Sequence, residues 1–198
     1  MNKISMTHFV DFVLKAGTPR LTTVRATKTT RHDLLSDFYL PLREAMLDMH
    51  RSGKPISALR DHLAALEDER KKRIYPEIVK GYEKFLAATG ATFFEPPAGT
   101  LKMGGLAINI NPEVGLEIGG VPHLVKLYFR GESLSARRVS ITLDLMAQSG
   151  IAQRVPGAVL GVLDLRKAKL HTLGAANPRV SLLLRGEAAS FSAIYASI

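Results

Sequence analysis

A change of hydrophobic period near Pro96-Pro97 constrains this chain more than any other feature. Upstream of the two prolines, apolar residues recur at helical spacing, as in the i, i+1, i+4, i+7, i+8 series that begins at Ile78. Downstream of them, apolar and polar residues alternate over short runs, which is typical of β-strands. Helices that are segregated from strands indicate an α+β fold. We therefore predict a helical N-terminal half followed by a mainly antiparallel sheet.

The N-terminal half contains signals for several helix ends. Ser5 can cap a first helix and Gly17 can end it, while Pro76 either kinks a long helix or starts a new one. The segment 18–32 is rich in threonine and in basic residues, so we expect it to be extended or loosely structured. The predicted helices cover residues 5–16, 39–51, 57–74 and 76–89.

The second half is predicted to contain the order β-β-β-α-β, followed by C-terminal strands. A hairpin turns at Gly119-Gly120, because paired glycines supply the positive φ angles of a two-residue turn. The predicted strands cover residues 101–110, 114–118, 121–130, 158–165, 168–173, 180–185 and 189–197, and the predicted helix covers 134–148. Residues 1–90 would then be a helical region and residues 91–198 an α+β sheet region, which we expect to form one integrated domain.

Composition narrows the class of protein. The 198 residues include no cysteine, which excludes disulfides and thiolate metal sites, and no apolar run is long enough to span a bilayer. We therefore expect a soluble, cytoplasmic protein with no membrane partner. The formal net charge of +9 favours nucleic acid or another polyanion as a partner, because a positive field attracts phosphates.

The position of the turn at Gly119-Gly120 predicts which residues face each other across the two strands of the hairpin. A two-residue turn places Glu113 directly opposite Lys126, on the face that also carries Glu117, Leu124 and Arg130. The other face is apolar and is predicted to face the core, with His123 among its residues. The facing acid and base are either an ion pair on a solvated sheet face or part of a functional site.

The stretch around Pro112-Glu113 and Lys126 resembles the PD-(D/E)xK nuclease superfamily. In that family a helix, three antiparallel strands, a helix and a fourth strand carry an acid at the start of the second strand and an acid-x-Lys on the third. The resemblance covers roughly residues 76–165 and departs from the family at Leu124, which stands in place of the second acid. It implies a catalytic set and, with Mg²⁺ or Mn²⁺ as cofactor, a metal-binding pair. The implied catalytic residues are Glu113, Lys126, Glu117 and Glu77, and the implied metal ligands are Glu113 and Glu117.

Basic clusters are the remaining functional signal, because lysine and arginine bind phosphates. The candidate nucleic-acid-binding residues are Arg20, Arg25, Lys28, Arg70, Lys71, Lys72, Arg73, Lys126, Arg130, Arg166, Lys167 and Lys169.

Three functions remain open on the sequence alone. The first is a non-catalytic binder of nucleic acid or another polyanion, the second a PD-(D/E)xK-like metal-dependent nuclease or a lapsed member of that family, and the third a protein-protein adaptor that uses its helical half.

Overall fold

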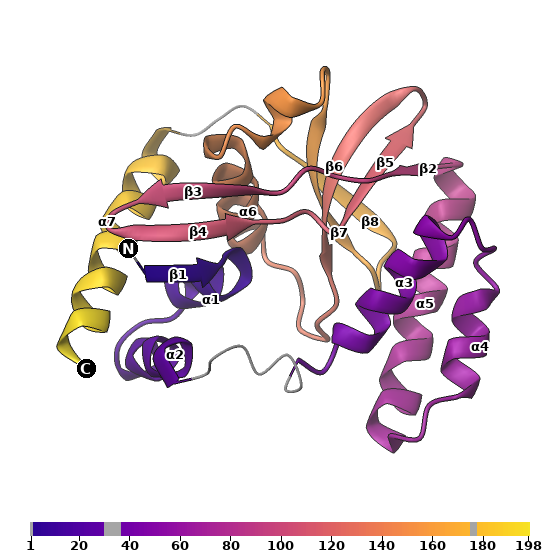
Figure 1. Cartoon of the computed structure of the whole chain (residues 1–198), viewed down its shortest axis with the longest axis horizontal. Coiled ribbons are helices and arrows are strands. Elements are labelled where there is room, and N and C mark those ends of the chain that lie inside the picture. The colour runs from indigo at the N-terminus through magenta and orange to yellow at the C-terminus, as the bar shows by residue number, and fades with distance from the viewer. Residues whose placement is uncertain (1, 30–36, 175–177) are drawn as a thin grey trace.

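The computed structural model describes residues 2–29, 37–174 and 178–198, which form two sheets with helices around them (Figure 1). The predicted α+β class and the helical N-terminal half are confirmed. No helix in the described ranges combines the length and the apolar character that crossing a membrane requires.

The larger sheet has five strands in the order β2-β5-β6-β7-β8. Only β6 and β7 run parallel, and α6 makes the crossover between them that parallel neighbours require. Its elements are β2 (Thr92–Phe94), β5 (Val114–Ile118), β6 (Val121–Tyr128), α6 (Ala136–Gln148), β7 (Val159–Asp164) and β8 (Lys169–Thr172). The hairpin between β5 and β6 has the predicted register, with Val114 opposite Val125.

The smaller sheet has three strands in the order β1-β4-β3. Its strands are β1 (Asn2–Ser5), β3 (Gly99–Met103) and β4 (Leu106–Ile110). The prediction of one strand over 101–110 is wrong, because Gly104 and Gly105 both have positive φ angles, 53° and 83°, and turn the chain back. β1 was not predicted, since it pairs in parallel with β4 about a hundred residues away and that partner is invisible to local patterns.

Two helices of the N-terminal half follow the predictions closely. The helix predicted over 5–16 is α1 (Met6–Leu14), in which the Ser5 hydroxyl accepts a hydrogen bond from the His8 amide at 3.2 Å, and the helix over 39–51 is α3 (Leu40–Arg51). The predicted helix over 57–74 is wrong, because α4 (Ala58–Ala64) ends early and Asp68 caps a new helix, α5 (Glu69–Thr89). Pro76 therefore lies inside α5 and does not begin it.

Two segments predicted to be extended are helical. Residues 18–29 form α2 (Thr18–Thr29), and residues 30–32 of the same prediction lie outside the described residues. The threonine hydroxyls that favoured an extended chain instead donate to carbonyl oxygens one turn back, as Thr27 does to Thr23 at 3.0 Å. The predicted strands 180–185 and 189–197 are parts of α7 (Pro178–Ser197), which buries Leu184, Ala188 and Phe191 at helical spacing.

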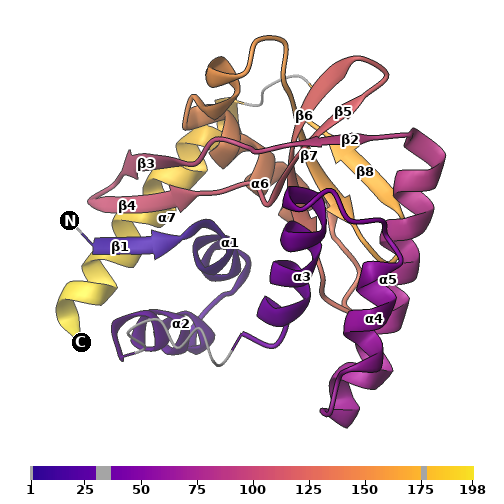
Figure 2. The same ribbon diagram turned by 45° about the vertical axis from the view of Figure 1, so that its right-hand side comes forward.

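Helices cover both faces of the five-stranded sheet. Figure 2 shows α3, α4 and α5 grouped together, and α1, α2 and α7 lie at the other end of the molecule. One core lies between α3, α4, α5 and side chains such as Val125 and Leu127, and a second lies between α1, α6, α7 and side chains such as Leu124 and Tyr128. The alternative in which the second face of the hairpin is solvated is therefore contradicted. At the hairpin tip Val121 is 41% exposed, so the apolar face extends beyond the core there.

Candidate functional site

Glu113 and Lys126 meet as the hairpin register predicts, but they meet inside the protein. Their exposed fractions are 7% and 9%, and Lys126 Nζ donates a hydrogen bond to Glu113 Oε1. The alternative of an ion pair on a solvated face is therefore contradicted. The side chains of Leu124 and Tyr128, which lie on the same face of β6, belong to the core between the sheet and α6.

The end of β5 explains why a carboxylate sits at residue 113. The ladder with β6 ends at Val114, whereas β6 continues to Tyr128, so the amide of Leu127 has no strand partner on that side. Glu113 Oε2 accepts a hydrogen bond from this amide at 2.8 Å. The carboxylate thereby satisfies a backbone donor that would otherwise be buried without an acceptor.

Two further groups surround the pair. Arg43 Nη1 lies 4.0 Å from Glu113 Oε1, and Lys126 Nζ lies 3.4 Å from the main-chain oxygen of Asn111. A buried carboxylate with two cations and one amide donor is well compensated for its lost hydration. Both of its oxygens are already engaged, so a metal ion would have to displace the Lys126 ammonium to bind here.

The other residues implied by the nuclease resemblance do not converge on this pair. Glu117 is exposed and lies four residues further along β5, roughly 13 Å at the rise of a strand. Glu77 is exposed on α5, which packs against the opposite face of the sheet, and it pairs with Arg166. Leu124 is fully buried. Within the described residues, no three His, Cys, Asp or Glu side chains gather to hold a metal.

Three predicted phosphate-binding residues hold elements of the fold together. Arg20 pairs with Glu187 of α7 at 2.5 Å, and Arg130 pairs with Asp11 of α1. Lys28 donates to the main-chain oxygens of Tyr195 and Ile198. These contacts join residues more than a hundred positions apart, which the sequence alone could not reveal. Arg25 is exposed on α2.

The cluster at the start of α5 is mixed. The Arg70 guanidinium lies over the Phe38 ring at 4.8 Å, Lys72 pairs with Glu69 at 2.7 Å, and Lys71 is half-buried. Arg73 is exposed, and within the described residues it makes no hydrogen bond or ion pair. Of this cluster, Arg73 is therefore the residue most open to a phosphate.

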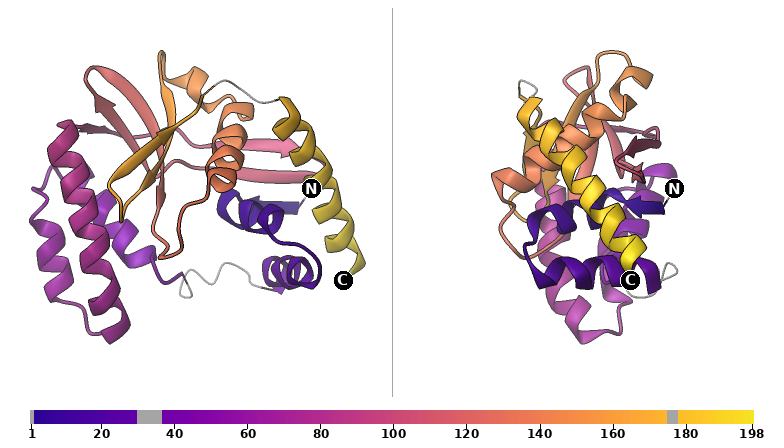
Figure 3. Two further views of the ribbon diagram at one scale, coloured as in Figure 1. Left: turned by 180° about the vertical axis from the view of Figure 1, so that it is seen from behind. Right: turned by 90° about the vertical axis from the view of Figure 1, so that its left-hand side faces the viewer.

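The structure brings two of the predicted basic clusters together. The turn between β7 and β8 packs directly on α5, where a Cβ atom on Gly81 would lie only 1.7 Å from the Leu165 carbonyl oxygen. Arg166 of this turn pairs with Glu77, one helical turn before Gly81. The left panel of Figure 3 shows the β7–β8 hairpin beside the α5 ribbon. Residues 70–73 and the turn residues 166 and 167, far apart in the sequence, thus contribute to one side of the molecule.

We call this side the basic face. One stripe of α5 carries Glu77 and three basic residues at helical spacing from it. Arg73 lies four residues before Glu77, Lys80 lies three residues after it, and Lys84 lies seven residues after it. The basic face consists of Arg73, Lys80, Lys84, Arg166 and Lys167. Lys169 is paired with Asp164 in the β7–β8 register, so it lies on the other face of the sheet from α5 and is not part of this surface. Lys80 and Lys84 were missed in the prediction, although their helical spacing from Arg73 was present in the sequence.

Several polar groups elsewhere in the core have structural partners. His50 contacts the Tyr82 hydroxyl at 2.5 Å and stacks on Phe93, and burial lowers the pKa of His50 to about 4. Burial also raises the pKa of the Tyr82 hydroxyl. Asp164 is buried and accepts a hydrogen bond from the Lys167 amide at 3.2 Å, which fixes the β7–β8 turn. The Asp164 carboxylate therefore helps to hold the turn that carries Arg166 and Lys167.

Comparison with known proteins adds no family to this description. No protein-family model matches the chain, and no curated protein matches its sequence.

Proposed function

We propose that this protein binds nucleic acid through the basic face and has no nuclease activity. The observation that carries the proposal is the convergence of the α5 stripe and the β7–β8 turn. Glu77 is the acidic residue of that stripe, and its charge is already balanced by Arg166. The net charge of +9 adds a long-range attraction to the same polyanion.

The dimensions of the basic face suit a phosphate backbone. Arg73 and Lys84 are eleven residues apart on α5, which corresponds to roughly 16 Å at the rise of a helix. One strand of B-DNA carries a phosphate about every 3.4 Å of axis, so roughly four to six phosphates fall within reach of the face. Lysine and arginine contacts to phosphates give affinity without reading the sequence. We therefore expect binding with little sequence preference.

The order of elements supports a relationship to the PD-(D/E)xK core. α5 is followed by β2, β5 and β6, which are antiparallel neighbours, and then by α6 and the parallel strand β7. The β3–β4 hairpin would be an insertion between the first and second core strands. The chemistry favours a lapsed member, because Leu124 offers no metal ligand and Glu113 is held by Lys126. We expect no cleavage of DNA or RNA with Mg²⁺ or Mn²⁺.

The adaptor alternative has less support. Within residues 2–29 and 37–90, Leu21 is the only large hydrophobic side chain that is strongly exposed, at 36%. An interaction surface on the helical half would call for a larger apolar patch.

A charge-reversal experiment tests the proposal. Lys80, Lys84 and Lys167 are exposed, so changing all three to glutamate should leave the fold intact. A control protein carries the same charge change at Lys15, Arg137 and Arg185, which are exposed outside the basic face. Fluorescence anisotropy with a short DNA duplex should show at least about a tenfold loss of affinity for the first protein and a much smaller loss for the control. Equal losses would mean that net charge, and not this face, attracts the nucleic acid.

A further inference from the structure

Among the residues that the structure describes, no helix covers one face of the three-stranded sheet. Leu106, Ile108 and Ile110 of β4 point into the core with α1, α6 and α7. Figure 1 shows β1, β3 and β4 in front of α6, with no described segment in front of the strands. Exposed side chains on the opposite face of the sheet, such as Asn109 and Thr100, are therefore open to a ligand.

Two cross-strand rows occupy this open face. The strand register aligns Ser5, Asn109 and Thr100 in one row. It aligns Lys3, Ala107 and Lys102 in the next row, two residues along each strand. A row of hydrogen-bonding groups thus lies beside a row that carries two ammonium groups.

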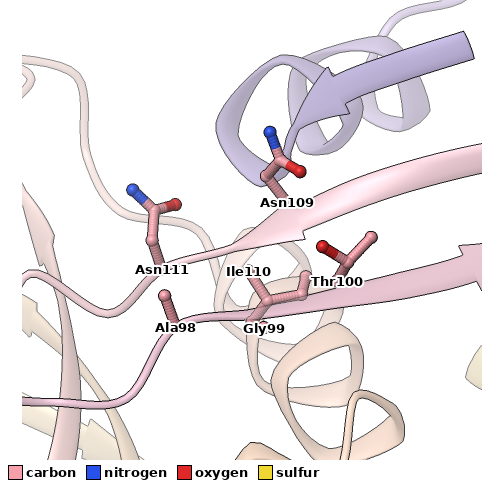
Figure 4. A pocket seen from close by; sticks show the side chains of 6 residues that line it. All are labelled: Ala98, Gly99, Thr100, Asn109, Ile110 and Asn111. Atoms are coloured by element: carbon pink, nitrogen blue, oxygen red, sulfur yellow. The ribbon is translucent and has the colours of Figure 1, made fainter.

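A pocket of about 400 Å³ lies at the end of the first row. It is lined by Ala98, Gly99, Thr100, Asn109, Ile110 and Asn111. Figure 4 shows the side chains of Thr100, Asn109 and Asn111 projecting to the same side of the strands. Within the part of the chain that the structure describes, none of these three side chains has a hydrogen-bond or ionic partner. Their donors and acceptors are therefore available to a ligand.

The charges around the pocket are positive. The three strands contain Lys3 and Lys102 and no acidic residue. Both lysines are exposed and without a partner among the described residues. Arg154 reaches the pocket from another element and donates to the main-chain oxygen of Ala98 at 2.6 Å. A ligand with an anionic group would complement this side of the pocket.

From these contacts we infer that the pocket binds a nucleotide. The asparagine amides each offer a donor and an acceptor side by side, which is the pattern that pairs with the edge of an adenine base. Lys102 lies on the same face two residues from Thr100 and is placed to meet a phosphate. The volume falls within the range of about 300–1,000 Å³ that small-molecule sites occupy. The nucleotide comes either from free solution or from a nucleic-acid strand, and both present the same chemistry.

The inference does not depend on the basic face, because none of its residues belongs to that face. Isothermal titration with adenosine monophosphate tests the first source. Titration with a short deoxyadenosine oligonucleotide tests the second and uses the protein with Lys80, Lys84 and Lys167 changed to glutamate, so that the basic face does not contribute.

Two changes should abolish or weaken binding. Asn109→Ala together with Asn111→Ala should lower affinity by about tenfold or more, because it removes both amides. Lys102→Ala should lower affinity about fivefold and reduce its salt dependence. Gln153→Ala and Arg137→Ala are matched controls, since both side chains are exposed and lie outside the pocket and outside the basic face. Far-ultraviolet circular dichroism and thermal unfolding confirm that each variant is folded.

Each outcome decides the inference. Monophosphate binding that the asparagine changes weaken supports a site for free nucleotides. Oligonucleotide binding alone, weakened by the same changes, supports a site for one nucleotide of a strand. Absence of binding by both probes, or binding that the asparagine changes leave intact, overturns the inference.

Discussion

Replacing Lys126 by methionine separates a structural ion pair from an active-site lysine. Methionine is apolar and about as long as the aliphatic part of lysine, so it fills the same space. The Glu113 carboxylate, which is 7% exposed, then stays buried without its closest cation. Removing one partner of a buried pair costs about 3–5 kcal/mol of unfolding free energy. Arg43 remains 4.0 Å from the carboxylate and compensates part of the loss. We therefore expect destabilisation of about 3 kcal/mol.

The double change Glu113→Gln with Lys126→Met is the control. The neutral amide can still accept the hydrogen bond that the Leu127 amide donates at 2.8 Å, and no buried charge is left alone. We expect the double variant to lie within about 1–2 kcal/mol of the natural protein, because buried pairs are often replaceable by neutral groups. The double variant should thus be more stable than the single one.

Urea unfolding measures this difference. The chain has no tryptophan, so circular dichroism at the helix band is the suitable probe, and an unchanged denaturant slope shows that only stability has changed. A Lys126→Met protein as stable as the natural one, or more stable, would refute the structural interpretation. Active-site groups held ready for chemistry often stabilise a protein when they are replaced.

Three further predictions test the fold around the proposed surfaces. Gly81→Ala should lower stability by about 1–3 kcal/mol and weaken DNA binding in anisotropy, because its Cβ would lie 1.7 Å from the Leu165 carbonyl oxygen and push the β7–β8 turn away from α5. Burial lowers the pKa of His50 to about 4, so the folded state favours the neutral ring. The free energy of unfolding should therefore fall as the pH drops from about 6.5 to 4. The expected loss is roughly 1–2 kcal/mol, because the ring is only partly buried. His50→Gln should flatten that part of the pH profile in urea titrations. Phe191→Ala should cost about 3–5 kcal/mol, whereas Leu182→Ala, 69% exposed, should change stability by less than about 0.5 kcal/mol if α7 is the helix described.

Local patterns predicted the parts of the fold that depend on neighbouring residues. The paired glycines at 119–120 set the β5–β6 register, and with it the meeting of Glu113 and Lys126. Ser5 marked the start of α1. These signals succeed because turn and cap geometry depends on a few adjacent residues.

Tertiary packing decided what local patterns could not. The threonine-rich residues of α2 are helical because Val24 is buried in the core shared with α1 and α7, which outweighs a weak extended preference. The burial of Glu113 depends on helices that cover the second face of the sheet, and alternation along one hairpin does not reveal them. The approach of Arg166 to α5 likewise requires the position of the β7–β8 turn, which the sequence could not supply.

The salt dependence of DNA affinity tests the central claim most directly. Each phosphate neutralised by the protein contributes about −0.9 to the slope of log affinity against log salt concentration. Contact with roughly four to six phosphates predicts a slope of about −4 to −5 for the natural protein, and the protein with Lys80, Lys84 and Lys167 changed to glutamate should lose about 2–3 of that slope. A slope near zero, or one that these three substitutions leave unchanged, would contradict binding through the basic face.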